Sequence, residues 1–424
     1  MARPRRALRS GRLRKDLRRQ LLPAAQAPMT DSGEWPPAGA TELLWCVSAP
    51  PEGRLMLAAY AKRTYQIDDG RLSLADEQIP LVVEPVVEEP DEALPSWLKD
   101  DTDLLAPKPA TDVVVMGAAH ALEPTEELHV SVAAGRSVRR LCVQGERRVE
   151  MGADGRAEFS PGASFDSVAL CPQNAYGGRD LHAQWALEED ELGQRLLDLP
   201  EPLRPQETVW LYEYPRNPVG QGFFLDVDRL RADGARLPQI EDPGDRLTPE
   251  RLFRRAPTAW IDAPIPGQLG WVHHSWYPRL VRYLGKMLDH DPPERELREA
   301  SFPDGDDLRL DHDDESSRVD PRALQGASPG LAIERLCGGE QVILENLHPS
   351  RSRIELSLPT ETPKLRIRPS HVDALTPAAI LQTVRLEPDR DRLSLTWVGA
   401  VPLLGPVDDD FIMNTPLRVS WQRG

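Results

Sequence analysis

The patterns of apolar and polar residues predict β-strands near both ends of this chain. The predicted strands are 43–47, 54–67, 71–74, 128–132 and 138–143 in the first part. In the last part they are 341–345, 354–358, 365–367, 383–386 and 393–397, where apolar and polar residues largely alternate. A period of two predicts β-strands with one buried and one exposed face. Asp68-Asp69-Gly70 predicts a hairpin turn, and Pro388-Asp389-Arg390-Asp391 predicts a turn between the last two strands. We expect the strands of the two ends to close one antiparallel β-sandwich, with two separate β domains as the alternative.

A different pattern occurs at residues 101–120. Pro107-Lys108-Pro109 excludes helix, because each proline ring fixes φ and pushes the preceding residue to extended geometry. The run Val113-Val114-Val115 predicts a short strand that is buried on both faces. Gly117 is the expected bulge or close-approach point at its end. This stretch therefore predicts a rigid, extended Lys108 that leads into a core strand.

The middle of the chain has a helical period in two places. Residues 181–199 and 276–290 carry apolar side chains at three- and four-residue spacing, whereas residues 84–95 and 303–321 are acidic and predict surface loops. Proline makes up 42 of 424 residues, about twice the usual share, which argues against long helices. The fold class expected is mainly β (α+β), with a loop-rich middle that carries a few helices. The expected regions are a disordered basic leader at 1–40, β-strands at 41–180, loops and helices at 181–325, and β-strands at 326–424.

Charge is distributed unevenly. The chain has a net charge of −17, but residues 1–28 contain nine basic residues and one acid, which leaves −25 for the rest. An acidic body argues against nucleic acid and anionic membranes as partners. For the leader, Pro23 interrupts the apolar run and disfavours a signal peptide. Three other interpretations of the leader remain. It is a basic arm that binds nucleic acid or membrane, an upstream extension of the reading frame before a true start at Met29, or a disordered tail.

Neither cysteine spacing nor hydropathy indicates export or a membrane span. The four cysteines lie far apart without a C-x-x-C pair, which suits a reducing cytoplasm. No run of eighteen apolar residues is present, so no membrane helix is predicted. We therefore expect a cytoplasmic protein.

Few residues point to catalysis or to a cofactor. The chain has no G-x-S-x-G, Walker-type, H-E-x-x-H or G-x-G-x-x-G motif. His120 is the best single candidate for an acid or base. His273 and His274 are adjacent, and neighbours on a strand point apart, so they do not predict a shared metal site. The acidic residues at 303–321 lack the glycine and closing glutamate of a calcium loop. The expectation is no enzyme, no metal and no cofactor.

Several short motifs together resemble a known family. In order along the chain they are Lys62-Arg63-Thr64-Tyr65, Glu77-Gln78-Ile79-Pro80, Lys108-Pro109 with Thr111-Asp112, Gly117 and Ala119-His120, Gly145-Glu146-Arg147, Ala175-Tyr176-Gly177-Gly178, Asn217-Pro218-Val219-Gly220-Gln221-Gly222, and Leu237-Pro238-Gln239-Ile240-Glu241. The set is similar to the domain of unknown function 2169 family, bacterial proteins encoded mainly among type VI secretion genes. The chain departs from the family after Trp276-Tyr277-Pro278-Arg279, where a Gly-Thr-Tyr-Asp segment is often found.

The resemblance implies an adaptor or chaperone that helps to load an effector or a PAAR-like tip protein onto the VgrG spike. The glycine motifs suggest rigid loops whose bare backbone accepts a partner, or tight turns that only reverse the chain. Candidate contact residues are Lys108, Asp112, His120, Arg147, Tyr176, Gly177, Gly178, Asn217, Pro218, Gly220, Gly222 and Glu241. One alternative is a hydrolase that uses His120 with a carboxylate such as Asp112 or Glu241. The other is a structural component of the secretion apparatus, which would self-associate.

Overall fold

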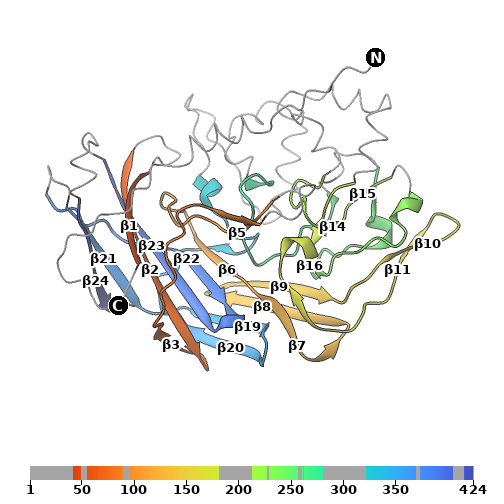
Figure 1. Cartoon of the computed structure of the whole chain (residues 1–424), viewed down its shortest axis with the longest axis horizontal. Helices are drawn as coiled ribbons and strands as arrows, with labels where there is room; N and C mark the ends of the chain where they lie inside the picture. The colour runs from red at the N-terminus through yellow and green to blue at the C-terminus, as the bar shows by residue number, and fades with distance from the viewer. Residues whose placement is uncertain are drawn as a thin grey trace, which may run out of the picture.

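The computed structural model is mainly β (Figure 1). It describes residues 42–48, 55–88, 96–180, 213–226, 229–255, 260, 262–279, 321–368, 373–403 and 415–423. The basic leader, the helix expected at 181–199 and nearly all of the acidic segment at 303–321 lie outside the described residues. Of the helix expected at 276–290, only the first four residues are described.

Strands from both ends of the chain form one seven-stranded sheet. Its members are β1 (Glu42–Ser48), β2 (Met56–Asp68), β3 (Arg71–Leu74), β6 (Thr111–Val115), β18 (Ala332–Ile333), β22 (Ile380–Glu387) and β23 (Arg392–Pro402). The order is β1-β2-β23-β22-β6-β18, and β3 pairs with β2. All pairs are antiparallel except β22 with β6. The prediction that strands of the two ends combine is confirmed.

Turn chemistry fixes the register of two hairpins. Asp69 and Gly70 both have positive φ, 47° and 79°, between β2 and β3. This matches the mirror-image turn that an Asp-Gly pair favours. The 3-10 turn η7 (Pro388–Arg390) joins β22 to β23, and Asp391 follows it in the left-handed region. Both turns lie where the sequence predicts them.

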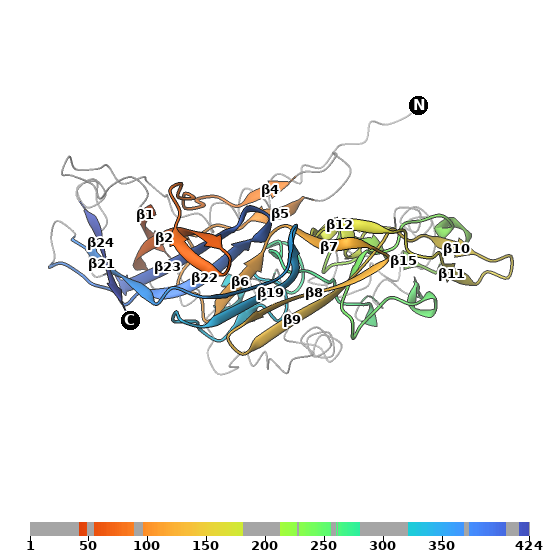
Figure 2. The same cartoon turned by 90° about the horizontal axis from the view of Figure 1, so that it is seen from below.

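A five-stranded antiparallel sheet faces the first one. Its order is β16-β9-β8-β19-β20, and its strands are β16 (Ile240–Glu241), β9 (Ser137–Gln144), β8 (Glu127–Ala134), β19 (Gln341–His348) and β20 (Arg351–Ser357). Figure 2 shows β8 and β9 beneath β22 and β23. One hydrophobic cluster contains residues of both sheets, including Val114, Val132 and Leu395. The two sheets therefore form a sandwich around a common core.

The strand β6 is buried along its whole length, as the apolar run Val113-Val114-Val115 predicts. Gly117 follows it with φ +145°. A Cβ atom at Gly117 would lie 2.9 Å from a carboxylate oxygen of Asp389. The positive φ itself favours glycine at this position, and the approach of the Asp389 side chain leaves little room for a Cβ atom.

Smaller two-stranded sheets lie around the sandwich. They pair β4 (Val86–Glu88) with β5 (Trp97–Asp100), β7 (Ala118–Thr125) with β12 (Phe165–Ala169), β10 (Val149–Met151) with β11 (Ala157–Phe159), β13 (Tyr176–Gly177) with β14 (Gln221–Gly222), β15 (Phe224–Leu225) with β17 (Phe253–Arg254), and β21 (Glu361–Ile367) with β24 (Leu417–Arg423). Within the described residues, the short 3-10 segments besides η7 are η1 (Pro172–Asn174), η2 (Arg229–Ala232), η3 (Pro249–Arg251) and η6 (Pro321–Leu324). A separate aromatic-rich cluster, which includes Tyr214 and Trp260, fills the middle region.

Two local expectations are corrected. Residues 84–95 were expected to form only a loop, but Val86–Glu88 pairs with β5, where Val87 lies opposite the buried Leu98. His273 and His274 were expected to point apart, but their rings stack with centroids 4.1 Å apart. They lie at a turn rather than on a strand, so the alternation of side chains does not apply. Within the described residues, no helix has the length and apolar character to cross a membrane.

Candidate functional site

Lys108 and Asp112 form an ion pair inside the protein. The Lys108 Nζ lies 2.6 Å from Oδ2 of Asp112, and the side chains are 1% and 0% exposed. Both oxygens of Asp112 have further donors: Gln325 Nε2 at 2.7 Å to Oδ1, and the backbone N–H of Gly326 at 2.9 Å to Oδ2. These bonds satisfy a carboxylate that would otherwise be costly to bury.

The same pair ties the extended lead-in to a distant segment. Arg335 donates to the carbonyl oxygen of Lys108 at 2.5 Å, and the ammonium of Lys108 stands 5.4 Å from the ring centroid of Trp271. Lys108 and Asp112 thus fasten β6 to residues 325–335. Their contribution to partner binding stays a prediction, and it would act through the position of β6 rather than through direct contact.

The two glycine motifs, at residues 175–178 and 217–222, lie side by side. Strand β13 pairs in parallel with β14, so Tyr176 lies opposite Gln221 and Gly177 opposite Gly222. The N–H of Gly178 donates to the oxygen of Asn217 at 2.9 Å, and the N–H of Phe223 donates to the oxygen of Gly177 at 3.0 Å. We call residues 175–178 with 217–222 the glycine junction.

Asn217 is the centre of the glycine junction. Its buried amide nitrogen donates to the carbonyl oxygens of Pro172 and Tyr176, at 2.7 and 3.0 Å. Gly178 has φ +107°, and a Cβ there would stand 2.5 Å from the oxygen of Gly220. The backbone groups in these bonds are satisfied within the chain, as expected for tight turns, the second of the two interpretations of the glycine motifs. Contact of a partner with Pro218, Gly220 or Gly222 stays a prediction.

Arg147, which is partly buried, and the buried Glu241 form a second ion pair beside the junction. Arg147 donates to Oε2 of Glu241 at 2.9 Å and to the carbonyl oxygen of Pro238 at 3.0 Å. The other oxygen, Oε1, accepts the backbone N–H of Leu247 at 2.8 Å. Because Pro238 also packs against Gly222, the Arg147–Glu241 pair and the junction form one continuous structure.

Tyr176 belongs to the core of the middle region. Its ring is 1% exposed and meets the ring of Tyr214 edge-on, with centroids 5.1 Å apart. Burial raises the pKa of Tyr176 to about 12, against a smaller opposing effect of Arg254. Tyr176 therefore remains neutral at physiological pH and contributes packing rather than charge.

His120 lies apart from these groups, at the partly exposed end of the sandwich. Its Nε2 is 2.7 Å from Oδ1 of Asp389, and the side chains are 17% and 34% exposed. The carboxylate beside His120 is therefore Asp389, and not Asp112 or Glu241 as expected. From the sequence, Asp389 is predicted only to be a turn residue. It lies 269 residues from His120 in the chain, so no local pattern indicates that the two are in contact.

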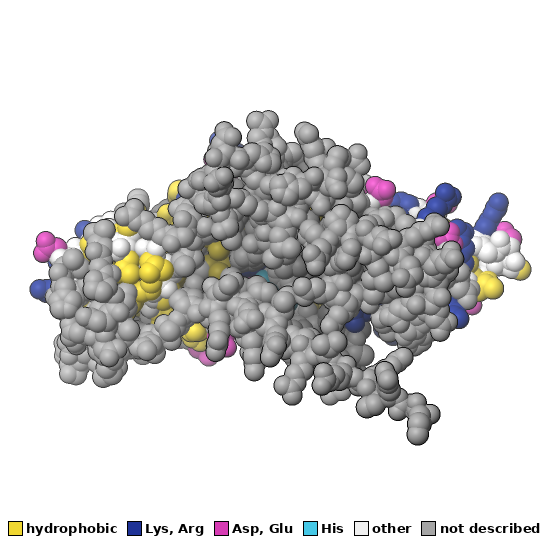
Figure 3. Space-filling model, turned by 90° about the horizontal axis from the view of Figure 1, so that it is seen from above, with side chains coloured by type: hydrophobic (Ala, Val, Ile, Leu, Met, Phe, Trp, Pro, Cys, Tyr) yellow, Lys and Arg dark blue, Asp and Glu magenta, His cyan; other side chains and the backbone are white. Residues whose placement is uncertain are grey.

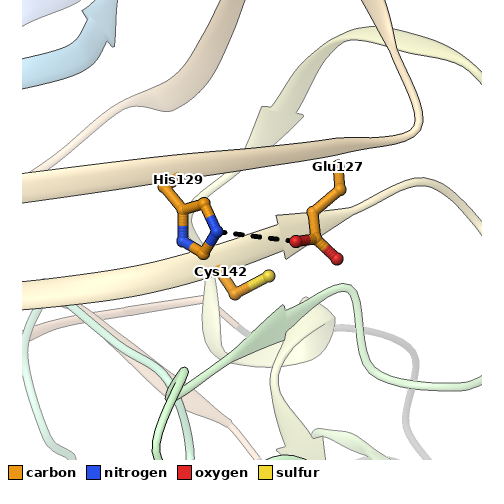
Figure 4. A group of neighbouring side chains, drawn as sticks. All are labelled: Glu127, His129 and Cys142. Carbon is orange, nitrogen blue, oxygen red and sulfur yellow. Dashed lines mark ion pairs between the residues drawn. The ribbon is translucent and has the colours of Figure 1, made fainter.

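Three possible metal ligands converge on the outer face of β8 and β9 (Figure 4). Ligand atoms of Glu127, His129 and Cys142 all lie within 4.8 Å of one another. His129 is directly opposite Cys142 in the strand register, and Glu127 is two residues before His129. Burial raises the pKa of the Cys142 thiol to about 11. The sequence does not reveal this group, because the pairing of β8 with β9 brings Cys142 to it.

The surface carries both charged and apolar side chains. Figure 3 shows Lys, Arg, Asp and Glu side chains together at the end of the molecule that carries β10 and β11. Here Arg148 pairs with Glu146, and Arg156 pairs with Asp154. Leu122 on β7 and Leu230 on η2 are apolar side chains that are 60% and 64% exposed. Leu122 lies two residues from His120, so both project from the same side of the strand.

Comparison with known proteins places the chain in a family. Neither a curated protein nor a solved structure gives a significant match. A family model described as "Uncharacterized protein conserved in bacteria (DUF2169)" matches residues 52–398. This range contains all the motifs of the sequence resemblance and the strands of both sheets, except β1 and the last residues of β23. The chain belongs to the DUF2169 family of bacterial proteins.

Proposed function

We propose that this protein is a non-enzymatic accessory protein of a type VI secretion system, which acts as an adaptor or chaperone. It would bind a secreted effector or a PAAR-like tip protein and help to load it onto the VgrG spike. Support comes from the motifs that resemble the DUF2169 family, whose members are encoded mainly among type VI secretion genes. The body of the chain, with a net charge of −25 outside residues 1–28, suits a partner with a basic or apolar surface.

One observation carries the binding role: Leu122 is exposed on β7 beside the His120–Asp389 pair. An exposed leucine on a strand offers apolar contact area, and the neighbouring hydrogen-bonded His120 and Asp389 offer polar contacts at its rim. The Lys108–Asp112 pair anchors β6, which leads through Gly117 into β7. A fixed strand that presents a mixed surface is suited to recognition of a protein.

The test begins with affinity capture of the full chain from its native bacterium and identification of bound proteins by mass spectrometry. The captured spike, PAAR-like or effector protein is then purified and titrated against wild type, Leu122→Asp and Leu230→Asp. We expect Leu122→Asp to weaken binding at least about tenfold, since it places a charge in an apolar contact. Leu230→Asp is the matched control and should bind like wild type.

Two outcomes would contradict the proposal. Equal affinities of Leu122→Asp and Leu230→Asp for the partner would show that the partner does not bind the surface around Leu122 on β7. Failure to recover any of the three partner types, together with a monomeric protein in solution, would remove the adaptor role. Self-association without a partner, measured by light scattering, would instead favour a structural component of the apparatus.

A second candidate function is hydrolysis, and the His120–Asp389 pair favours it. A carboxylate beside an imidazole orients the ring as a general base. Ser167 lies directly opposite His120 in the register of β12 with β7, and its side chain is exposed. Ser167 is therefore the residue that would act as the nucleophile.

Labelling with a fluorophosphonate probe decides this alternative. Covalent modification of Ser167 that disappears in His120→Ala, together with turnover of an activated ester, would establish a hydrolase. Absence of labelling in a folded protein that still binds its partner would exclude it. Ser160→Ala, a serine whose hydroxyl accepts from the backbone of Arg148, is the control for nonspecific effects.

A further inference from the structure

We infer that Glu127, His129 and Cys142 form a binding site for a zinc ion on the outer face of the β8–β9 hairpin. The inference does not depend on the proposed function. A thiolate, an imidazole and a carboxylate are the donor types that zinc accepts together, and a thiolate disfavours calcium and magnesium. The donor atoms lie within 4.8 Å of one another, so small rotations of the side chains bring them to one ion.

The geometry suits a tetrahedral ion. With bonds of about 2.0–2.1 Å from zinc to nitrogen or oxygen, two ligand atoms of a tetrahedron stand about 3.4 Å apart. Nε2 of His129 lies 3.5 Å from Oε1 of Glu127. In Figure 4 the sulfur of Cys142 points toward the same space from the neighbouring strand. The three side chains therefore occupy one side of a tetrahedral site.

Surrounding residues hold Glu127 for this role. Its second oxygen, Oε2, accepts from Gln144 Nε2 at 2.8 Å and from Arg246 at 2.9 Å. Oε2 is thus held by these two donors, while Oε1 is directed toward His129 and Cys142. Carboxylate ligands of metals are commonly hydrogen-bonded in this way. Glu241 is also near, but its oxygens are bound to Arg147 and to the N–H of Leu247. Glu241 is therefore not counted as a ligand.

The fourth ligand position of the tetrahedral zinc ion follows from the charge and the solvent exposure of the other three ligands. The Cys142 thiol releases its proton to solvent as the bond from sulfur to zinc forms, and the thiolate and the Glu127 carboxylate together balance the ion. The side chains of His129 and Glu127 are 63% and 42% exposed. The fourth position consequently faces water. The ion would link β8 to β9 at the point where β16 joins the sheet.

Cobalt binding provides the direct test. Full-length protein without a histidine tag is stripped with a chelator and then titrated with Co²⁺ or Zn²⁺. We expect one ion per chain, a thiolate-to-cobalt charge-transfer band, and a higher melting temperature with Zn²⁺. Cys142→Ser should abolish the band. Cys337→Ser, at the exposed cysteine, is the matched control and should keep it.

Further variants keep the test decisive if Cys142→Ser does not fold. Glu127→Gln and His129→Gln change exposed side chains, and each should weaken Zn²⁺ binding by about tenfold or more. Gln144→Met should weaken it by about 10- to 100-fold through the loss of its bond to Glu127. The inference is overturned if no cobalt band appears, or if binding is unchanged in both Glu127→Gln and His129→Gln.

Discussion

Nζ of Lys108 and Oδ2 of Asp112 are 2.6 Å apart at a point where neither side chain reaches solvent. The two residues are four positions apart, at the boundary between a proline-restricted lead-in and the buried strand β6. Because the carboxylate also accepts from Gln325 and Gly326, the pair connects the first third of the chain to the last. Removal of either charge would leave the other buried without an opposite charge beside it.

Lys108→Met therefore tests the strength of this connection. We expect the free energy of unfolding to fall by about 3–5 kcal/mol, the usual cost of one unpaired buried charge. Urea unfolding followed by circular dichroism measures it. The double variant Lys108→Met, Asp112→Asn should recover part of the loss, because no buried charge remains. A loss below about 1 kcal/mol for the single variant would contradict the role of the pair.

Gly178→Ala tests the glycine junction. The residue has φ +107°, and its new Cβ would meet the oxygen of Gly220 at 2.5 Å, so backbone must move. We expect a loss of more than about 3 kcal/mol, above the roughly 1–2 kcal/mol of left-handed geometry alone. Gly155→Ala is the control, with φ +75° and open space around its Cβ. Similar denaturation midpoints for the two variants would show that the junction is not tightly packed.

His348 predicts a pH dependence of stability. Burial first, and the cation of Arg351 second, lower the pKa of His348 below its ordinary value of about 6.5. Nδ1 of the neutral ring accepts the N–H of Ser350 at 3.1 Å, a bond that protonation removes. The unfolded chain then binds the proton more tightly than the folded protein. Stability conferred by neutral His348 is complete above about pH 6.5 and is lost as pH falls below it.

Melting temperatures between about pH 7 and 5 measure this effect. His348→Asn keeps an acceptor for Ser350 but does not titrate in this range. Its melting temperature should decline less steeply than that of wild type as pH falls. Parallel curves for the two proteins would assign the decline to other groups.

Cysteine reactivity should follow burial. Desolvation raises the pKa of Cys46 and of Cys171, and that of Cys142 to about 11. The thiolate is the reactive form, so these three should alkylate slowly, whereas Cys337 is exposed. We expect iodoacetamide at about pH 8, with a chelator present, to label Cys337 first. Mass spectrometry identifies the site, and all four should react in denaturant. Early labelling of Cys46 would contradict its buried position.

Local patterns predict the strands well. Alternation at 71–74 and the Asp-Gly turn before it match β3 and its hairpin. The turn specifies this pairing, since no residue of β3 is itself buried. The apolar run of β6 is likewise buried on both faces. The short strand β4 was missed, since its stability comes from pairing with β5 rather than from its own exposed side chains.

The candidate sites depend far more on tertiary structure. The sequence identifies Lys108, Asp112, Asn217 and Gly178, but not their environment. Their neighbours in space come from segments distant in the chain, such as Gln325 for Asp112. For the same reason Asp389 beside His120, and Cys142 beside His129, have no signature in the sequence.

The sequence by itself determined the β class, the turns and the two-faced burial of β6, because side-chain periodicity and backbone restriction act between near neighbours. Tertiary structure alone decided which strands pair, as in β2 with β23 and β8 with β19. It also decided that the carboxylate beside His120 is that of Asp389. Those choices depend on long-range packing of two sheets around one core, where many strands have similar local patterns and only the complete set of contacts distinguishes them.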